Sequence, residues 1–165
     1  MKTLLLIGGG IEAVPVIAQA NAMGLATIVV DGDVHAPGRQ HADTPWHLST
    51  YDALGIAKHA LAYHRNDQPI HGVLAACADV PLSVAVVART LGLPGPSMQT
   101  GFLASDKLAM KERLHVVGIP IPWFARCWSL DDLKTTIVQR GYPLVLKPVD
   151  SREYVLRRMP RGCEG

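Results

Sequence analysis

Two lysines stand where an ammonium group can meet an anion. Lys107 follows Asp106 at the predicted start of a helix, and Lys147 follows an apolar run and precedes Pro148. The run predicts a strand over residues 144–146, so Lys147 is expected at the strand end, with its stem buried and its ammonium group offered to an anion. For each lysine alone, an ordinary solvated side chain is the favoured interpretation. Together, with the pattern that connects them, they indicate an anion-binding site.

A glycine-rich turn provides a second place for a ligand. Residues 8–13 fit the pattern G-x-G-x-x-A between a predicted strand and a helix, and Asp31 ends the next predicted strand, as the dinucleotide-binding fingerprint requires. Small residues let backbone N–H groups and a helix N-terminus approach a phosphate. Gly9, Gly10 and Asp31 are therefore candidate substrate-binding residues. Three interpretations stay open: glycines needed only for steric reasons, an NAD site, and a related fold that uses the turn for another ligand.

Asp79 is a further candidate substrate-binding residue. It follows a predicted strand over residues 72–76, and open α/β sheets bind ligands beyond the carboxyl ends of their strands. It is equally well placed to cap the following helix at its N-terminus. No metal site is predicted, because the loop histidines His35, His41 and His47 lack i, i+4 spacing and a cysteine partner. No catalytic nucleophile is predicted either.

These residues require a framework of alternating strands and helices. Continuously apolar segments predict buried strands at 3–7 and 26–30, joined by a helix over 12–23 in a right-handed βαβ unit. Further strands are predicted near 46–48 and over 72–76, 123–127 and 144–146, and further helices over 51–64, 80–91, 105–117 and 130–140. Residues 93–97, Leu-Pro-Gly-Pro-Ser, mark the predicted domain boundary. The expected fold class is α/β, with a Rossmann-like parallel sheet.

The composition is that of a soluble globular protein. The 165 residues are 48% apolar and 18% charged, and no apolar run is long enough to span a membrane. Three cysteines without metal-ligand spacing predict reduced thiols and a cytoplasmic location. The formal net charge of +2 lies in residues 151–165, where arginines outnumber glutamates. Arginines without a supporting fold do not favour nucleic-acid binding.

The series from Thr100 to Pro148 resembles the ATP-grasp superfamily. It runs Thr100-Gly101-x3-Ser105-Asp106-Lys107-x3-Lys111-x2-Leu114-x3-Gly118-Ile119-Pro120-x-Pro122 and then Gly141-Tyr142-Pro143-Leu144-Val145-Leu146-Lys147-Pro148. The preceding region, with the turn at residues 8–10, Asp31 and Ala42-Asp43, resembles the Rossmann-like domain that precedes the ATP-grasp domain in the same enzymes. The resemblance covers residues 1 to about 152.

The resemblance implies an ATP-dependent carboxylate–amine ligase. In that superfamily, the lysines that correspond to Lys107 and Lys147 contact the phosphate or the adenine of ATP. ATP phosphorylates a carboxylate, an amine attacks the acyl phosphate, and Mg²⁺ stabilises charge on the transferring phosphoryl group. The implied partners are ATP and a carboxylate or amine substrate, with a homodimer as a candidate assembly.

After Arg152 the sequence departs from the superfamily pattern. A glycine-rich loop, hinge residues for adenine and a lobe with Glu/Asn ligands for Mg²⁺ are expected there, but residues 150–152 lead into a tail of different composition. This departure favours the hypothesis of a frameshift or truncation just after Arg152, with a non-native or disordered tail at residues 153–165. The chain is then expected to lack Mg²⁺ ligands and to be inactive alone.

The predicted organisation follows from these observations. It comprises a Rossmann-like domain at residues 1–97, a partial α+β first lobe of an ATP-grasp domain at 98–152, and the tail at 153–165. The predicted function is that of the N-terminal portion of an ATP-dependent carboxylate–amine ligase. The alternative is a non-catalytic Rossmann-like protein that binds a nucleotide or metabolite at the glycine-rich turn and Asp79. An NAD-dependent oxidoreductase fragment is a third hypothesis.

Overall fold

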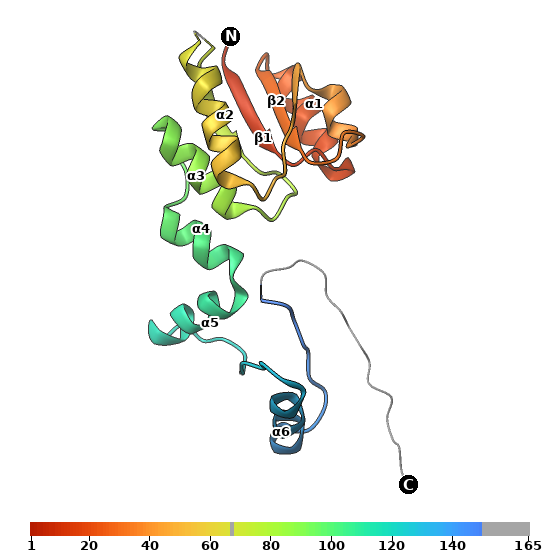
Figure 1. The fold of residues 1–165 in the computed structure, drawn as a ribbon, viewed down its shortest axis with the longest axis vertical. Coiled ribbons are helices and arrows are strands. Elements are labelled where there is room, and N and C mark those ends of the chain that lie inside the picture. Colours follow the sequence, from red (N-terminus) through yellow and green to blue (C-terminus); the bar gives the residue numbers. More distant parts are fainter. Residues whose placement is uncertain (67, 150–165) are drawn as a thin grey trace. The chain divides into compact units, whose positions relative to one another are not determined.

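The structure, a computed structural model, describes residues 1–66 and 68–149 and divides the chain into two compact units (Figure 1). The first unit is Met1–Ser105, and the second begins at Asp106. The tail predicted at residues 153–165 lies outside the described residues. In chain order, the first unit contains β1 (Thr3–Ile7), the 3₁₀-helix η1 (Ile11–Ala13), α1 (Val14–Ala22), β2 (Ala26–Asp31), the 3₁₀-helix η2 (Pro37–His41), β3 (Thr44–His47), α2 (Ala53–Arg65), β4 (Ile70–Leu74), α3 (Pro81–Leu91) and α4 (Met98–Ser105).

The first unit is built on a four-stranded sheet with the strand order β3-β2-β1-β4, in which every neighbouring pair is parallel. Leu5 of β1 lies opposite Ile28 of β2, and Ile7 lies opposite Val30. The two central strands are apolar without alternation, because both faces of a parallel sheet are covered when helices pack on each side. The predicted α/β fold class is confirmed.

The core lies on both faces of this sheet. Leu5 of β1 packs with Ile56 of α2 and Val87 of α3 on one face, whereas Leu6 packs with Ile17 of α1 on the other. Figure 1 shows α1 and α2 on opposite sides of the strands. Each of these side chains is at most 1% exposed. Burying an aliphatic side chain of this size stabilises the fold by about 1.5–3 kcal/mol.

Local capping signals set the ends of the helices. α1 ends at Ala22 and its C-cap residue Met23 is followed by Gly24, whose φ of +73° suits glycine. The N–H of Leu25 donates to the carbonyl oxygen of Ala20 at 3.1 Å. α2 begins after Asp52, whose carboxylate accepts the N–H of Gly55 at 2.9 Å. The predicted helices at these positions are confirmed, with ends that differ by one or two residues from the prediction.

β4 begins earlier than the strand predicted at residues 72–76, because the apolar run that it buries starts at Ile70. Its pairing with β1 contains an irregularity: Thr3 lies opposite Ile70, but Leu4 lies opposite Gly72. His71 is the extra residue, and its Nδ1 accepts the N–H of Thr3 at 3.0 Å. An imidazole thus accepts a backbone N–H at this bulge in the ladder.

The sequence predicted no element between residue 97 and residue 105, but the structure forms α4 there. Gly101 weakens the helical signal, because glycine is a poor helix former. In the structure it permits close packing: a Cβ on Gly101 would lie 2.8 Å from the Cβ of Ala85 in α3. Because α4 packs on α3, the division between the units falls after Ser105, later than the boundary predicted at residues 93–97.

The second unit contains α5 (Lys107–Val116) and α6 (Leu130–Arg140). α6 has the predicted bounds, and the predicted N-cap Ser129 is confirmed. The Ser129 hydroxyl accepts the N–H of Asp132 at 3.1 Å, and the Asp132 carboxylate accepts the N–H of Ser129 at 3.1 Å. This reciprocal capping box satisfies backbone donors that a helix N-terminus leaves unpaired.

The strands predicted at residues 123–127 and 144–146 do not form, so this prediction was wrong. A strand needs a neighbour that pairs with its backbone N–H and C=O groups, and no segment of residues 106–149 is a strand. Val145 and Leu146 are accordingly 63% and 55% exposed, where the predicted strand would bury them.

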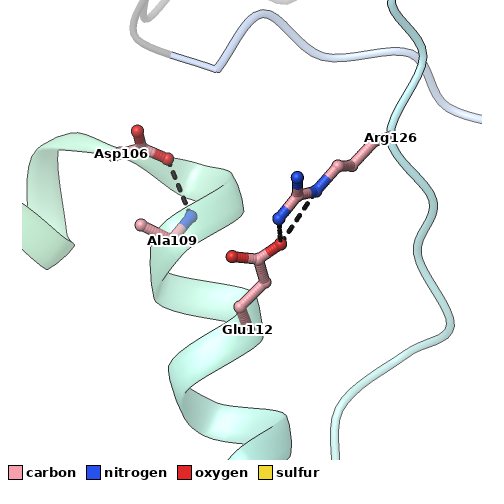
Figure 2. A network of polar contacts seen from close by, with 4 residues as sticks. All are labelled: Asp106, Ala109, Glu112 and Arg126. Atoms are coloured by element: carbon pink, nitrogen blue, oxygen red, sulfur yellow. Dashed lines mark hydrogen bonds and ion pairs between the residues drawn. The ribbon is translucent and has the colours of Figure 1, made fainter.

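Side-chain contacts join α5 to the connection that follows it. The guanidinium group of Arg126 forms an ion pair with the carboxylate of Glu112 (Figure 2), and Lys111 Nζ lies 5.6 Å from the centroid of the Phe124 ring. Such partly exposed pairs contribute about 0.2–1 kcal/mol each. No residue of α5 or α6 is buried, so the described part of this unit is held by surface contacts rather than by a core.

Candidate functional site

The carboxyl ends of the four parallel strands meet at one edge of the sheet, the edge at which open α/β sheets bind ligands. The loops after β1 and β4 touch each other there. Cys77 Sγ donates to the carbonyl oxygen of Glu12 at 3.2 Å, and a Cβ on Gly8 would lie 2.4 Å from the Cβ of Ala78. All four predicted substrate-binding residues belong to this edge, which we call the carboxyl edge.

The glycines of the turn allow close packing. Gly8 has a φ of +101°, in the region that favours glycine, and a Cβ on Gly9 would lie 3.0 Å from Val29 Cγ1 in β2. Gly10 opens η1, where its carbonyl oxygen accepts the N–H of Ala13 at 3.0 Å. The steric interpretation of the turn therefore has a geometric basis, while a ligand role for Gly9 and Gly10 stays a prediction.

The structure brings Gly9 and Asp31 together. Asp31 Oδ2 accepts the N–H of Gly9 at 2.7 Å, and its Oδ1 accepts the N–H of Asp33 at 2.8 Å. Both carboxylate oxygens thus accept a backbone N–H of the chain itself. In the dinucleotide fingerprint, the corresponding carboxylate bonds the ribose of the cofactor. The geometry of Asp31 therefore favours a role in shaping the turn over the NAD interpretation.

Arg39 is a residue of the carboxyl edge that the sequence analysis missed. Its guanidinium group, carried by η2, donates to the carbonyl oxygens of Asp31 and Trp46, at the ends of β2 and β3. The neighbouring Gly38 donates its N–H to the carbonyl oxygen of Gly9 at 2.7 Å. Arg39 is the sole Lys or Arg between residues 3 and 57. Its isolation, in a loop between two predicted strands, is the sequence feature that could have identified it as a site residue.

Asp79 belongs to the carboxyl edge and is not the N-cap residue of α3. The N-cap residue of α3 is Val80, so the capping alternative for Asp79 is wrong. Asp79 is exposed and directly follows Ala78, the residue that contacts Gly8. A role for Asp79 in ligand binding stays a prediction. The structure places it at the edge where that role requires it.

In the second unit, the structure brings together the two segments that carry the predicted ATP-binding lysines. Lys107 is the first residue of α5, and its N–H donates to the carbonyl oxygen of Val149 at 3.0 Å. Val149 lies shortly after Lys147 in the chain. Asp106 holds the start of α5, because its Oδ1 accepts the N–H of Ala109 at 2.8 Å (Figure 2).

Two searches of the described residues bear on metals and membranes. Among residues 1–66 and 68–149, no group of three or more His, Cys, Asp or Glu side chains is arranged to hold a metal ion. No helix in the described part of the chain has both the length and the apolar character needed to cross a membrane.

Comparison with known proteins finds partial similarity to characterised enzymes. No protein-family model matches the chain. The chain is 28% identical over 149 residues to the formate-dependent phosphoribosylglycinamide formyltransferase of Paraburkholderia xenovorans, with 90% of this chain and 36% of the relative covered. It is 24% identical over 121 residues to the L-arginine-specific L-amino acid ligase of Bacillus subtilis, with 73% of this chain and 29% of the relative covered.

A solved structure agrees with these relatives. The N5-carboxyaminoimidazole synthetase of Staphylococcus aureus, complexed with ADP, superposes with a TM-score of 0.72 at 20% identity, covering 92% of this chain and 39% of that chain. The fold is that of ATP-grasp ligases, and the predicted resemblance to this superfamily is confirmed. The chain spans little more than a third of these relatives, or less, so their complete activities are not carried over as findings.

Proposed function

We propose that the chain is the N-terminal, ATP- and substrate-binding portion of an ATP-dependent carboxylate–amine ligase. One observation carries the proposal: the hydrogen bond from the N–H of Lys107 to the carbonyl oxygen of Val149, at 3.0 Å, draws together the segments of Lys107 and Lys147. The superfamily resemblance gives each of these lysines a contact with ATP. Two ammonium groups presented from adjacent segments suit a polyphosphate.

We assign ATP and the second substrate to different units of the chain. Lys107 and Lys147 bind ATP, and the carboxyl edge, with Gly9, Gly10, Asp31 and Asp79, binds the carboxylate or amine substrate. The reaction of this class passes through an acyl phosphate, which the amine attacks. The turn is held in one conformation by Asp31 before a ligand arrives, which lowers the entropic cost of binding.

Mg²⁺ would share the charge of the ATP phosphates when bound. Among the described residues, no group of three or more His, Cys, Asp or Glu side chains is arranged to hold a metal ion. We therefore assign no step to Mg²⁺. The proposal includes ATP binding by this chain and assigns it no turnover.

Calorimetric titration of the full chain with ATP tests the proposal. Lys107→Met and Lys147→Met should each weaken ATP binding about tenfold, because each removes one ammonium group from the phosphates. The matched control is Lys134→Met, since Lys134 lies on α6 and pairs with Asp131 at 74% side-chain exposure. Equal ATP affinity in all four proteins would overturn the assignment of both lysines.

A non-catalytic Rossmann-like binding protein is the second candidate function. It is favoured by one contrast: the first unit has a buried core and a preformed carboxyl edge, whereas α5 and α6 bury no residue. A titration in which small metabolites bind at the carboxyl edge, while ATP does not bind at all, would favour this candidate. ATP hydrolysis by the chain would exclude it.

A further inference from the structure

Two histidine side chains fasten the start of β4 to its neighbours. Nδ1 of His71 accepts the N–H of Thr3, the first residue of β1, at 3.0 Å. Nδ1 of His64, in the last turn of α2, accepts the N–H of Ile70, the first residue of β4, at 3.1 Å. In the strand order β3-β2-β1-β4, β4 lies at the edge of the sheet. The two imidazoles therefore hold a strand that has β1 on one side and α2 next to its first residue.

Both hydrogen bonds require an uncharged imidazole. A neutral ring that accepts at Nδ1 carries its proton on Nε2, whereas both nitrogens of a protonated ring are donors. Protonation therefore turns each acceptor into a donor that faces a backbone N–H. Ile70 is only 1% exposed, so the loss of His64 as acceptor leaves a backbone N–H unpaired in the protein interior, which destabilises the folded state.

The charged groups of the elements around the two rings oppose a further positive charge. The amino terminus and Lys2 precede β1, Arg65 follows His64 in α2, and Arg89 lies in the last turn of α3. α3 packs on both α2 and β4. Within the described part of the chain, neither His64 nor His71 forms an ion pair with a carboxylate. Like charges disfavour protonation of both rings.

Two features act in the opposite sense. The carboxyl end of α2 carries a partial negative charge, which favours a cation at His64. Asp43 precedes β3 and is a carboxylate at the amino ends of the strands, but its Oδ2 accepts the N–H of Thr27 at 2.8 Å. β3 and β4 also lie at opposite ends of the strand order. Because His71 lies outside the helices, the larger effect of protonation is expected there.

We propose that His64 and His71 make the start of β4 sensitive to pH, so that protonation of the two imidazoles releases this end of the strand from α2 and β1. A histidine in an unfolded chain changes charge near about pH 6.5. Above that pH the two hydrogen bonds contribute their full stabilisation. The contribution is lost as the pH falls, because the unfolded chain takes up protons that the bonded rings exclude. This pH sensitivity belongs to the first unit and is independent of ATP binding.

Urea unfolding of the full chain at about pH 7.5 and about pH 5.5, followed through the amide signals of β1, tests the proposal. In the double variant His64→Asn with His71→Asn, amide oxygens replace the Nδ1 acceptors and do not titrate in this range. From the higher to the lower pH, the unfolding equilibrium constant of the unchanged chain should rise about tenfold more than that of the double variant. The matched control is His35→Asn with His41→Asn, at two exposed positions, which should keep the pH dependence of the unchanged chain. Equal pH dependence in the unchanged chain and the first double variant would overturn the proposal.

A titration of the unchanged chain gives a second readout that requires no variant. Nuclear magnetic resonance follows the imidazole signals of His64 and His71 and the amide signals of Thr3 and Ile70 over the same pH range. The Thr3 amide should shift with the midpoint of the His71 ring, and the Ile70 amide with that of the His64 ring. The amide of Leu6, which is buried in β1, should stay unchanged. Rings that titrate while the Thr3 and Ile70 amides do not move, or rings that stay neutral throughout, would overturn the proposal.

Discussion

The carboxylate of Asp31, at the end of β2, accepts the N–H of Gly9, in the turn after β1, at 2.7 Å. These residues are 22 positions apart in the chain, and their bond ties the ends of two neighbouring strands together. Because Oδ1 of the same carboxylate accepts the N–H of Asp33, one side chain organises both loops. The shape of the turn thus depends on a residue of another loop.

Removing this carboxylate should destabilise the first unit. Asp31→Ala leaves the N–H groups of Gly9 and Asp33 without their acceptor, and a loss of about 1–3 kcal/mol in the free energy of unfolding is expected. Asp31→Asn should cost less, because its single amide oxygen still accepts one of the two. Urea unfolding of the three proteins checks the order. Equal stability of Asp31→Ala and the unchanged chain would contradict it.

A second prediction concerns the stability that His71 contributes at the bulge between β1 and β4. Nδ1 of His71 accepts the N–H of Thr3 at 3.0 Å, so His71→Ala should destabilise the chain by about 0.5–1.5 kcal/mol. His71→Asn places an acceptor near the same position and should restore part of the loss. His35→Ala is the control, because His35 lies in an exposed loop, where substitutions change stability by about 0.5 kcal/mol or less. Thermal unfolding measures all three variants.

The contact between α3 and α4 makes a third prediction. A Cβ on Gly101 would lie 2.8 Å from the Cβ of Ala85 and 3.1 Å from the carbonyl oxygen of Pro81, so α4 must move to admit it. Alanine gains about 1 kcal/mol of helix propensity over glycine, but overpacking costs about 1–3 kcal/mol. We expect Gly101→Ala to be destabilising by urea unfolding, and Gln99→Ala, at an exposed position of α4, to be nearly neutral. A stabilised Gly101→Ala protein would show that α4 does not pack closely on α3.

The capping box of α6 predicts a dependence on pH. The pKa of Asp132 is lowered, chiefly because the N–H of Trp128 donates to its carboxylate at 2.8 Å. A carboxyl group whose pKa is lower in the folded state stabilises at pH values above its unfolded pKa, and this contribution is lost as the pH falls through the folded pKa. The helical chemical shifts of α6 should therefore hold from pH 7 to about pH 5 and decline below about pH 4. In Asp132→Asn this acid step should disappear, and a decline of the same size there would assign it to another group.

The open character of the second unit limits its affinity for ATP. Since α5 and α6 bury no residue, a bound nucleotide keeps much of its surface in water, and we expect a Kd above about 100 μM for Mg-ATP. Isothermal titration calorimetry on the full chain measures this value. A Kd near 1 μM would show that the described residues enclose ATP far better than their exposure indicates.

Short-range signals in the sequence determined much of this protein. The apolar runs of β1 and β2, the glycine after α1 and the Ser129 cap of α6 each act over a few residues, so their positions could be predicted without knowing the rest of the fold. The parallel sheet could also be predicted, because strands that alternate with helices along the chain pair in only a few ways. The carboxyl edge was predicted for the same reason.

Tertiary structure decided the elements and hydrogen bonds that depend on residues distant in the chain. Gly101 lowers the local tendency to form α4, and contact with α3 overrides it. Residues 144–146 have a strand-like pattern, but a strand requires a neighbouring strand, and none lies among residues 106–149. The bond between Asp31 and Gly9 joins residues of different loops, and no local spacing predicts that Asp31 turns inward to the backbone instead of outward to a ligand. Local patterns therefore placed the candidate residues, whereas long-range hydrogen bonds determined which of their groups bind the chain's own backbone.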